Sequence, residues 1–280
     1  MATPIPRTNL GKVSLHIMGL LLVLMICGCS SATPSLQNHS QMIQSVSPES
    51  VLKRISHTDT DVIRAMAHIE IRHPSGRFST KAAILLKKPA SLRIEAIPII
   101  GPVNCFLSIH ENVFKIFFPQ QGVFYIGQAT PENLAFVPNI FPEGLGIEDM
   151  VPIMFGTYPT LGEKNVSLKS SLEKERYRID MIYEGNILQS LWIDLKNQRL
   201  VEVQGFKGQD RKMAYTAIFE AFDTPDLLTI TMPHKITLIS EAEGHPKVTI
   251  RYSKVQRVPD IETTDFDLQI PPGINPTRLD

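Results

Sequence analysis

The chain has 280 residues, with 28 Lys or Arg and 28 Asp or Glu, so its formal net charge at pH 7 is zero. This balance excludes the strongly basic surface that nucleic-acid binding requires. With only three cysteines and 43% hydrophobic residues, the fold is expected to rest on an apolar core and not on disulfides.

The first 28 residues have the layout of an export signal. Arg7 and Lys12 form a basic start without acids, and Ile17–Ile26 is a run of ten uncharged residues, apolar except for Gly19. The run fits the hydrophobic core of a signal peptide and is shorter than the about 20 residues of a spanning helix. The alternative is an ordinary secretory signal that happens to contain two cysteines.

The segment Ile26-Cys27-Gly28-Cys29 resembles the site that bacterial lipoprotein signal peptidase cuts. The resemblance implies cleavage between Gly28 and Cys29 and acylation of Cys29, with palmitate among its lipids. A mature chain of 252 residues (280 − 28) would remain. In lipoproteins of this type Asp after the cysteine signals retention in the inner membrane; here Ser30 favours the outer membrane, facing the periplasm.

Residues 30–46 are rich in Ser and Gln and contain no Lys, Arg, Asp or Glu. This composition is typical of a flexible tether, which with Cys29 spans residues 29–46. A coil of about 17 residues reaches about 20–25 Å, which would keep the folded part close to the membrane. We expect one folded domain over residues 47–280.

The domain opens with a short helix and then switches to a period of two. Pro48 and Glu49 favour a helix over about 47–55. From Asp61 apolar and polar residues alternate, which indicates half-buried strands joined by short turns. The six strands expected here cover residues 61–71, 78–86, 92–96, 103–109, 113–118 and 123–126.

A helical insertion interrupts the strands. Thr130-Pro131-Glu132 predicts a helix through about Val137, and residues 147–155 predict a second helix, in which Pro152 would cause a kink or a later start. The strands expected after the insertion cover residues 177–183, 188–195, 200–206, 213–222, 229–240, 248–252 and 266–270.

Catalytic motifs are absent from the sequence, so no enzyme, cofactor or metal site is expected. His57, Asp59 and Asp61 could hold a metal ion, but a solvated turn uses the same residue types. Cys105 lies in an expected strand, where a small buried hydrophobe is the alternative to a reactive thiol.

An apolar connection, Ile97-Pro98-Ile99-Ile100-Gly101-Pro102, joins two expected strands. Connections usually face solvent, and a contiguous apolar tip is typical of a binding or membrane-contact site. The alternative is that Ile99 and Ile100 fold back onto the core.

The order of elements, with Leu92-Arg93-Ile94-Glu95 leading into Pro98-Ile99-Ile100-Gly101 and a helix ending in Phe155-Gly156, resembles the LolA/LolB family of periplasmic lipoprotein carriers and receptors. The resemblance implies an α+β, mainly β fold: a curved, incompletely closed antiparallel β-barrel of about 11–12 strands covered by helices. Ile100 stands where LolB has a protruding Leu that helps to insert lipoproteins into the outer membrane.

The resemblance also implies a function. An apolar cavity would bind lipid or lipoprotein acyl chains, with a periplasmic lipoprotein carrier as a partner, and the loop Pro98–Gly101 would contact the membrane. A structural or assembly lipoprotein that binds a protein partner in the cell envelope is the alternative. The residues expected to line the cavity are Ile69, Ile84, Ile94, Met150, Met154 and Phe155.

Overall fold

A computed structural model of the chain describes residues 47–56, 61–98, 101, 103–135, 145–162, 165–207, 212–222, 232–259 and 261–279. The chain divides into two units, Met1–Ser47 and Pro48–Asp280, and all described helices and strands belong to the second. The predicted boundaries at residues 28 and 46 lie outside the described residues.

The described residues form mainly strands. The strands of the first half are β1 (Val62–His73), β2 (Gly76–Lys87), β3 (Ser91–Ile97), β4 (Cys105–His110), β5 (Val113–Phe118) and β6 (Val123–Gln128). The strands of the second half are β7 (Ser167–Glu173), β8 (Arg176–Tyr183), β9 (Asn186–Asp194), β10 (Arg199–Lys207), β11 (Lys212–Phe222), β12 (Pro233–Ser240), β13 (Lys247–Arg257) and β14 (Thr277–Leu279).

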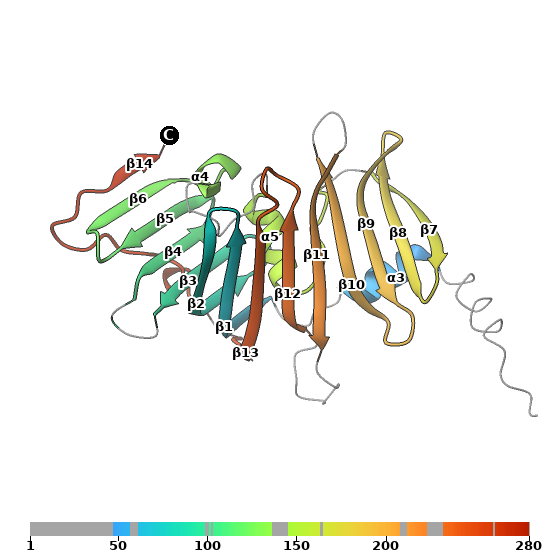
Figure 1. Cartoon of the computed structure of the whole chain (residues 1–280), viewed down its shortest axis with the longest axis horizontal. Coiled ribbons are helices and arrows are strands. Elements are labelled where there is room, and N and C mark those ends of the chain that lie inside the picture. Colours follow the sequence, from blue (N-terminus) through green and yellow to red (C-terminus); the bar gives the residue numbers. More distant parts are fainter. Residues whose placement is uncertain are drawn as a thin grey trace, which may run out of the picture. The chain divides into compact units, whose positions relative to one another are not determined.

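These strands form a single sheet in the order β14-β6-β5-β4-β3-β2-β1-β13-β12-β11-β10-β9-β8-β7 (Figure 1). Neighbouring strands are antiparallel except β14, which pairs with β6 in parallel. The two halves of the chain meet where β1 pairs with β13. In the described part the sheet is not closed, because β7 and β14 are left as its two edges. The predicted mainly β, incompletely closed fold is therefore confirmed at this level.

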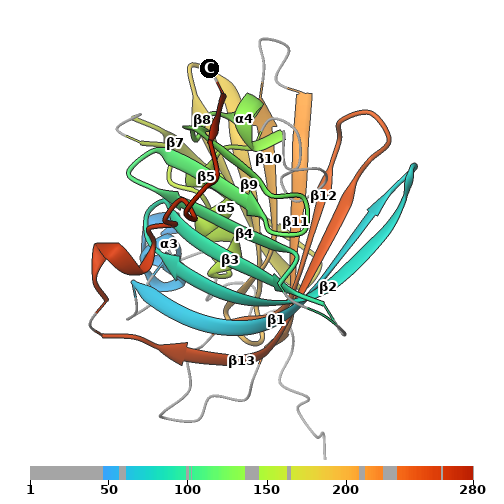
Figure 2. The same cartoon turned by 90° about the vertical axis from the view of Figure 1, so that its left-hand side faces the viewer.

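The sheet is curved, and its alternating pattern assigns one face to the core. Rows of paired residues such as Ile84, Ile94, Leu107 and Ile116 cross neighbouring strands on the same face and are at most 5% exposed. Figure 2 shows helix α5 (Ile147–Met154) behind β3, β4 and β5, inside the curve of the sheet. We call the side of the sheet that carries α5 the concave face and the opposite side the outer face.

A glycine lies just outside each end of helix α5, Gly146 as the N-cap and Gly156 after the C-cap Phe155. The backbone N–H of Gly146, the N-cap, donates to Oδ2 of Asp149 (3.3 Å), and acids in the first turn favour the helix dipole. Pro152 lies inside the helix, so the predicted later start is not seen. Gly156 ends it with φ +76°. A Cβ there would lie 2.1 Å from Cδ of Pro233, so glycine also allows β12 to approach.

The remaining helices are short. Helix α3 (Pro48–Ser56) has Glu49 in its first turn and Lys53 and Arg54 in its last, which complements the helix dipole at both ends. Helix α4 (Pro131–Ala135) follows β6, where Nδ2 of Asn133 donates to the carbonyl of Gln128 (2.9 Å). No helix among the described residues is long and apolar enough to cross a membrane.

Three sequence predictions differ from the structure. Strand β7 was not predicted, because most of its side chains are exposed and polar. The strand predicted at 266–270 is wrong: this stretch follows the 3₁₀ turn η1 (Thr263–Asp265) and pairs with no strand. The last strand is instead β14, so the described sheet has fourteen strands where 11–12 were expected.

Candidate functional site

The apolar concave face and α5 pack against each other. The hydrophobic side chains of the helix and of the residue after it are each at most 3% exposed. These side chains are Ile147, Met150, Val151, Ile153, Met154 and, just after the helix, Phe155. Side chains of α5 therefore fill the space next to the sheet where the family resemblance expects a cavity.

Three polar contacts attach α5 to the sheet. The hydroxyl of Tyr252 in β13 donates to the carbonyl of Met154 (2.9 Å), and burial raises the pKa of Tyr252, so the phenol stays a neutral donor. Nζ of Lys207 lies 2.5 Å from Oδ2 of Asp149. Nζ of Lys88 lies 5.0 Å from the ring centre of Phe155, within the range of a cation–π contact.

The six residues expected to line a cavity all lie on this packed surface. Ile69, Ile84 and Ile94 are at most 5% exposed on the concave face, and Met150, Met154 and Phe155 are at most 3% exposed on or next to α5. The sequence thus located the apolar surface between sheet and helix. That they contact a ligand stays a prediction.

The outer face carries a second packed region, formed by residues 258–276, which we call the C-terminal segment. Figure 2 shows it crossing β3, β4 and β5 on the face opposite α5. Phe266 is fully buried and joins Val62 and Leu85 in an apolar cluster. Arg93 of β3 fixes the segment by donating through Nη1 to the carbonyls of Asp265 (3.1 Å) and Asp267 (3.0 Å).

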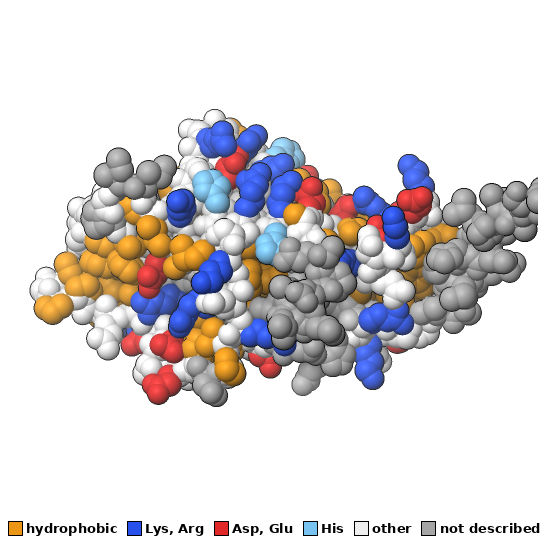
Figure 3. Space-filling model, turned by 90° about the horizontal axis from the view of Figure 1, so that it is seen from below, with side chains coloured by type: hydrophobic (Ala, Val, Ile, Leu, Met, Phe, Trp, Pro, Cys, Tyr) orange, Lys and Arg blue, Asp and Glu red, His pale blue; other side chains and the backbone are white. Residues whose placement is uncertain are grey.

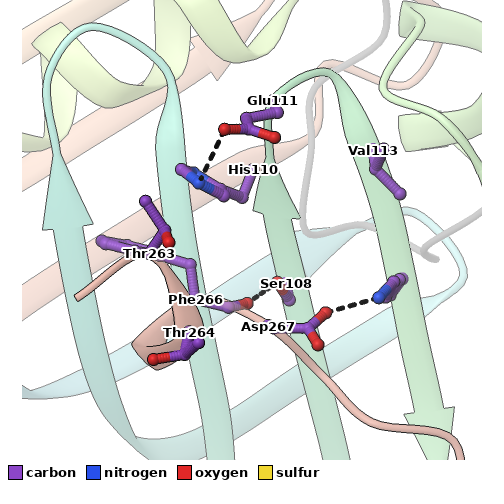
Figure 4. A pocket seen from close by; sticks show the side chains of 9 residues that line it. Ser108, His110, Glu111, Val113, Thr263, Thr264, Phe266 and Asp267 are labelled. Carbon is purple, nitrogen blue, oxygen red and sulfur yellow. Dashed lines mark hydrogen bonds and ion pairs between the residues drawn. The ribbon is translucent and has the colours of Figure 1, made fainter.

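A pocket of about 330 Å³ lies between β4, β5 and the C-terminal segment (Figure 4). The hydroxyl of Ser108 donates to the carbonyl of Phe266, and Nζ of Lys115 lies 2.5 Å from Oδ1 of Asp267. Nδ1 of His110 lies 2.9 Å from the hydroxyl of Ser91. The Ser108 and Lys115 contacts hold the segment in place. Ser108 and His110 are each bonded to other groups, so they do not form a nucleophile–base pair.

A second pocket of about 380 Å³ adjoins the C-terminal segment and β1–β3. It lies between the guanidinium groups of Arg64 and Arg93 and the acids Glu95 and Asp265. Nη2 of Arg93 is paired with Oε1 of Glu95 at 2.9 Å. Both pockets are lined by basic and acidic side chains together. This mixture does not select one class of ligand, and we interpret the pockets as clefts beside the packed segment.

Several predicted site residues lie outside the described residues: Gly28, Cys29, His57, Asp59, Ile99 and Ile100. At the apolar connection, Pro98 is half-buried and Gly101 is exposed with φ +101°. Asp61 is exposed, and no three His, Cys, Asp or Glu residues of the described chain group as a metal site.

The structure supports the interpretation of Cys105 as a small buried hydrophobe and not as a reactive thiol. Its side chain is 8% exposed, and burial raises the pKa of the thiol to about 12. A thiol at this pKa is protonated at neutral pH and is a poor nucleophile. It packs as a small hydrophobe.

Half-exposed aromatic side chains surround the end of the sheet that carries the apolar connection. Phe106 is the second residue of β4, and Phe117 and Phe118 are the last two residues of β5. The rings of Phe106 and Phe117 stack with their centres 6.3 Å apart. Seen from below, hydrophobic side chains gather at the β14–β4 end of the sheet (Figure 3). The sequence alone does not connect these aromatic residues with the loop, because only the strand register brings them together.

No protein-family model matches the sequence, and no curated protein matches it. Solved structures do match. A LolA-superfamily protein from Nitrosomonas europaea superimposes with a TM-score of 0.56 and 12% identity over 80% of this chain and 99% of that chain. This chain has a LolA-type fold. A DUF1329-family protein from Desulfovibrio piger matches with a TM-score of 0.55 and 10% identity, over 78% of this chain and 94% of that chain.

The LolA-type fold confirms the resemblance predicted from sequence, at the level of architecture. At 10–12% identity the similarity concerns the fold alone. Function has to be argued from the surfaces of this chain.

Proposed function

We propose that this protein is a lipoprotein, anchored by an acylated Cys29 in the outer membrane, that binds lipid or lipoprotein acyl chains on the concave face, beneath α5. The observation that carries the proposal is the continuous apolar face packed against a short, Met-containing helix. Acyl chains need no polar catalytic groups, because each buried CH₂ contributes about 0.8 kcal/mol. Unbranched Met side chains adapt readily to a ligand of variable shape.

Opening of the site would begin with α5, because the helix covers the apolar face. Most of its attachment is apolar packing, which acyl chains can replace with packing of the same kind. The described polar contacts that would be broken are few: the Tyr252 hydrogen bond, the Lys207–Asp149 ion pair and the Lys88–Phe155 contact.

To test binding, the mature chain is exported behind a conventional secretion signal with Cys29→Ala, which removes the acylation site. We expect a fluorescent fatty-acyl probe to bind with saturation and to be displaced by unlabelled acyl chains. A folded sample that takes up no probe at saturating concentration would contradict acyl binding. The anchor is tested separately, by mass spectrometry of Cys29 in the wild-type protein.

We also propose that the loop Pro98–Gly101 contacts the membrane during transfer of lipoproteins from a periplasmic carrier. The adjoining half-exposed aromatic side chains Phe106, Phe117 and Phe118 support this role, since aromatic rings favour the membrane interface. The double variant Ile99→Asp, Ile100→Glu is expected to keep its melting temperature and to lose transfer of lipoproteins to membranes. A variant that unfolds would place the loop in the core instead.

One observation favours a second candidate function. The side chains of α5 fill the concave face as described above, as expected of a structural or assembly lipoprotein whose surfaces bind a protein partner. Absence of probe uptake together with a stable partner in crosslinked pull-downs of the acylated protein would favour this candidate.

A further inference from the structure

Two polar side chains lie in one row within the apolar concave face, on either side of a glycine. Gln189 of β9 pairs directly with Gly205 of β10, and Gly205 pairs directly with Tyr215 of β11. The three residues therefore form one row across three strands, on the side of the sheet that faces α5. Gln189 is 2% exposed and Tyr215 is 1% exposed.

Gly205 brings the two polar groups together. A Cβ on this glycine would lie 2.2 Å from Cε1 and 2.8 Å from the hydroxyl oxygen of Tyr215. The phenol ring therefore lies across Gly205, with its hydroxyl directed toward β9. Because directly paired residues have Cβ positions about 4.5–5.5 Å apart, a ring that extends over Gly205 brings its hydroxyl toward the side chain of Gln189 on the next strand.

One atom of each side chain has no hydrogen-bond partner among the described residues. The Tyr215 hydroxyl and Oε1 of Gln189 are both buried and unbonded, although most buried polar atoms in proteins are satisfied. Tyr252 shows the usual situation on the same face, because its hydroxyl donates to the carbonyl of Met154. Two unbonded polar atoms in one row indicate a place for a polar group that the described residues do not supply.

The ladders around this row are irregular. The register of β10 with β11 shifts between Gly205 and Phe206, and that of β8 with β9 shifts between Met181 and Ile182. Such bulges redirect side chains and are common near binding sites. Both lie next to the Gln189–Gly205–Tyr215 row.

The electrostatics favour a neutral ligand group. Burial, together with the negative charge of Asp149, raises the pKa of Tyr215, so its hydroxyl remains protonated and can donate. The cation Lys207 at this end of α5 is already paired with Asp149. A carboxylate or phosphate brought to this row would meet the negative charge of Asp149, whose described cationic partner, Lys207, it would have to share.

We propose that Gln189 and Tyr215 form the polar end of the acyl-chain site and bind a neutral secondary amide of an acylated ligand. The Tyr215 hydroxyl donates to the amide carbonyl, and the amide N–H donates to Oε1 of Gln189. The inference rests on the proposed acyl-chain binding. Because Asp149 in the first turn of α5 lies near Tyr215, the ligand reaches the row when this turn moves off the sheet.

The test compares three ligands of equal chain length on the mature Cys29→Ala chain: an N-methyl fatty amide, the fatty acid anion and the corresponding alkane. Each competes with the fluorescent acyl probe. We expect the amide to bind about tenfold more tightly than the alkane, the ratio expected for a net hydrogen bond to buried groups. Gln189→Leu and Tyr215→Phe are expected to abolish this preference and to leave alkane affinity unchanged.

Tyr252→Phe is the matched control. It removes a buried hydroxyl that has a partner, so it should lower the melting temperature while the preference for the amide is kept. Tyr215→Phe removes a hydroxyl that has no hydrogen-bond partner among the described residues. The melting temperature of this variant should therefore equal or exceed that of the wild-type protein.

Four outcomes would overturn the inference. Equal binding of amide and alkane by the wild-type protein, or an undiminished preference in both variants, would remove the polar subsite and leave the proposed acyl binding intact. A fall in melting temperature for Tyr215→Phe as large as that for Tyr252→Phe would mean that a bound water satisfies the hydroxyl. No uptake of any probe would defeat the proposed function, and the inference with it.

Discussion

The concave and outer faces of the sheet are built from alternate residues of the same strands, yet they are stabilised in different ways. On the concave face, apolar rows pack against one short helix. On the outer face, ion pairs such as those of Glu70 with Arg72 and Arg77 lie beside a separate apolar cluster under the C-terminal segment. The concave face can exchange one apolar partner for another, whereas the outer face is fixed by specific polar contacts.

The largest expected effect is on the concave face. Phe155→Ala removes a ring that is 2% exposed between α5 and the sheet and should lower the free energy of unfolding by about 3–5 kcal/mol. Urea denaturation measures the change, with Phe78→Ala, whose ring is 47% exposed, as the control expected to lie within about 0.5 kcal/mol. A loss below about 1 kcal/mol for Phe155→Ala would show that α5 packs loosely.

A somewhat smaller effect is expected under the C-terminal segment. Phe266→Ala removes a fully buried ring, but the segment can detach from the outer face while the sheet stays folded. We expect a loss of about 2–3 kcal/mol and, more distinctively, faster proteolysis within residues 258–276. The control is Val113→Ala, in the same pocket but 40% exposed. If acyl-probe binding also fell, the two faces would be coupled and the comparison above would be wrong.

The smallest effect concerns the ion pairs of the outer face and depends on pH. Hydrogen bonds from Arg72, and then Arg77, hold the pKa of Glu70 below its ordinary value. A carboxylate with a lowered pKa stabilises the fold above its unfolded-state pKa, and this stabilisation is lost as pH falls through the folded-state pKa. Glu70→Gln should therefore lower the melting temperature at pH 7 and differ little from wild type near pH 3. Glu243→Gln, at an exposed site, is the control and should have the wild-type melting temperature at both pH values. If the melting temperature of Glu70→Gln stayed below that of wild type at pH 3, the charge of Glu70 would be ruled out as the cause.

The strands of the first half could be predicted closely, because one face of each is apolar and the period of two is strong. Strand β2 was expected at 78–86 and spans Gly76–Lys87. Strand β7 could not be predicted, since an exposed edge strand carries no such pattern. At Phe266 and Leu268 the same pattern misled, because the two side chains are buried by packing on the outer face and not by strand pairing.

The candidate site could be predicted only in part. Burial of Ile84, Ile94 and Met154 follows from the sequence, because period and apolar character determine it. The placement of Gln189 and Tyr215 on either side of Gly205 depends on the register of three strands, β9, β10 and β11, which no local pattern contains. The one available signal was Gly205 inside a strand, which often marks a close approach of another group.

The length of α5 has a consequence for how the concave face could open. The helix has eight residues and contains Pro152, whereas isolated helices shorter than about 12–15 residues are marginal in water even without proline. Off the sheet, α5 would lose its helical hydrogen bonds as well as its packing. Exposure of the apolar face is thus a local helix–coil transition, and the exchange rate of the α5 amide hydrogens would directly report how often it occurs.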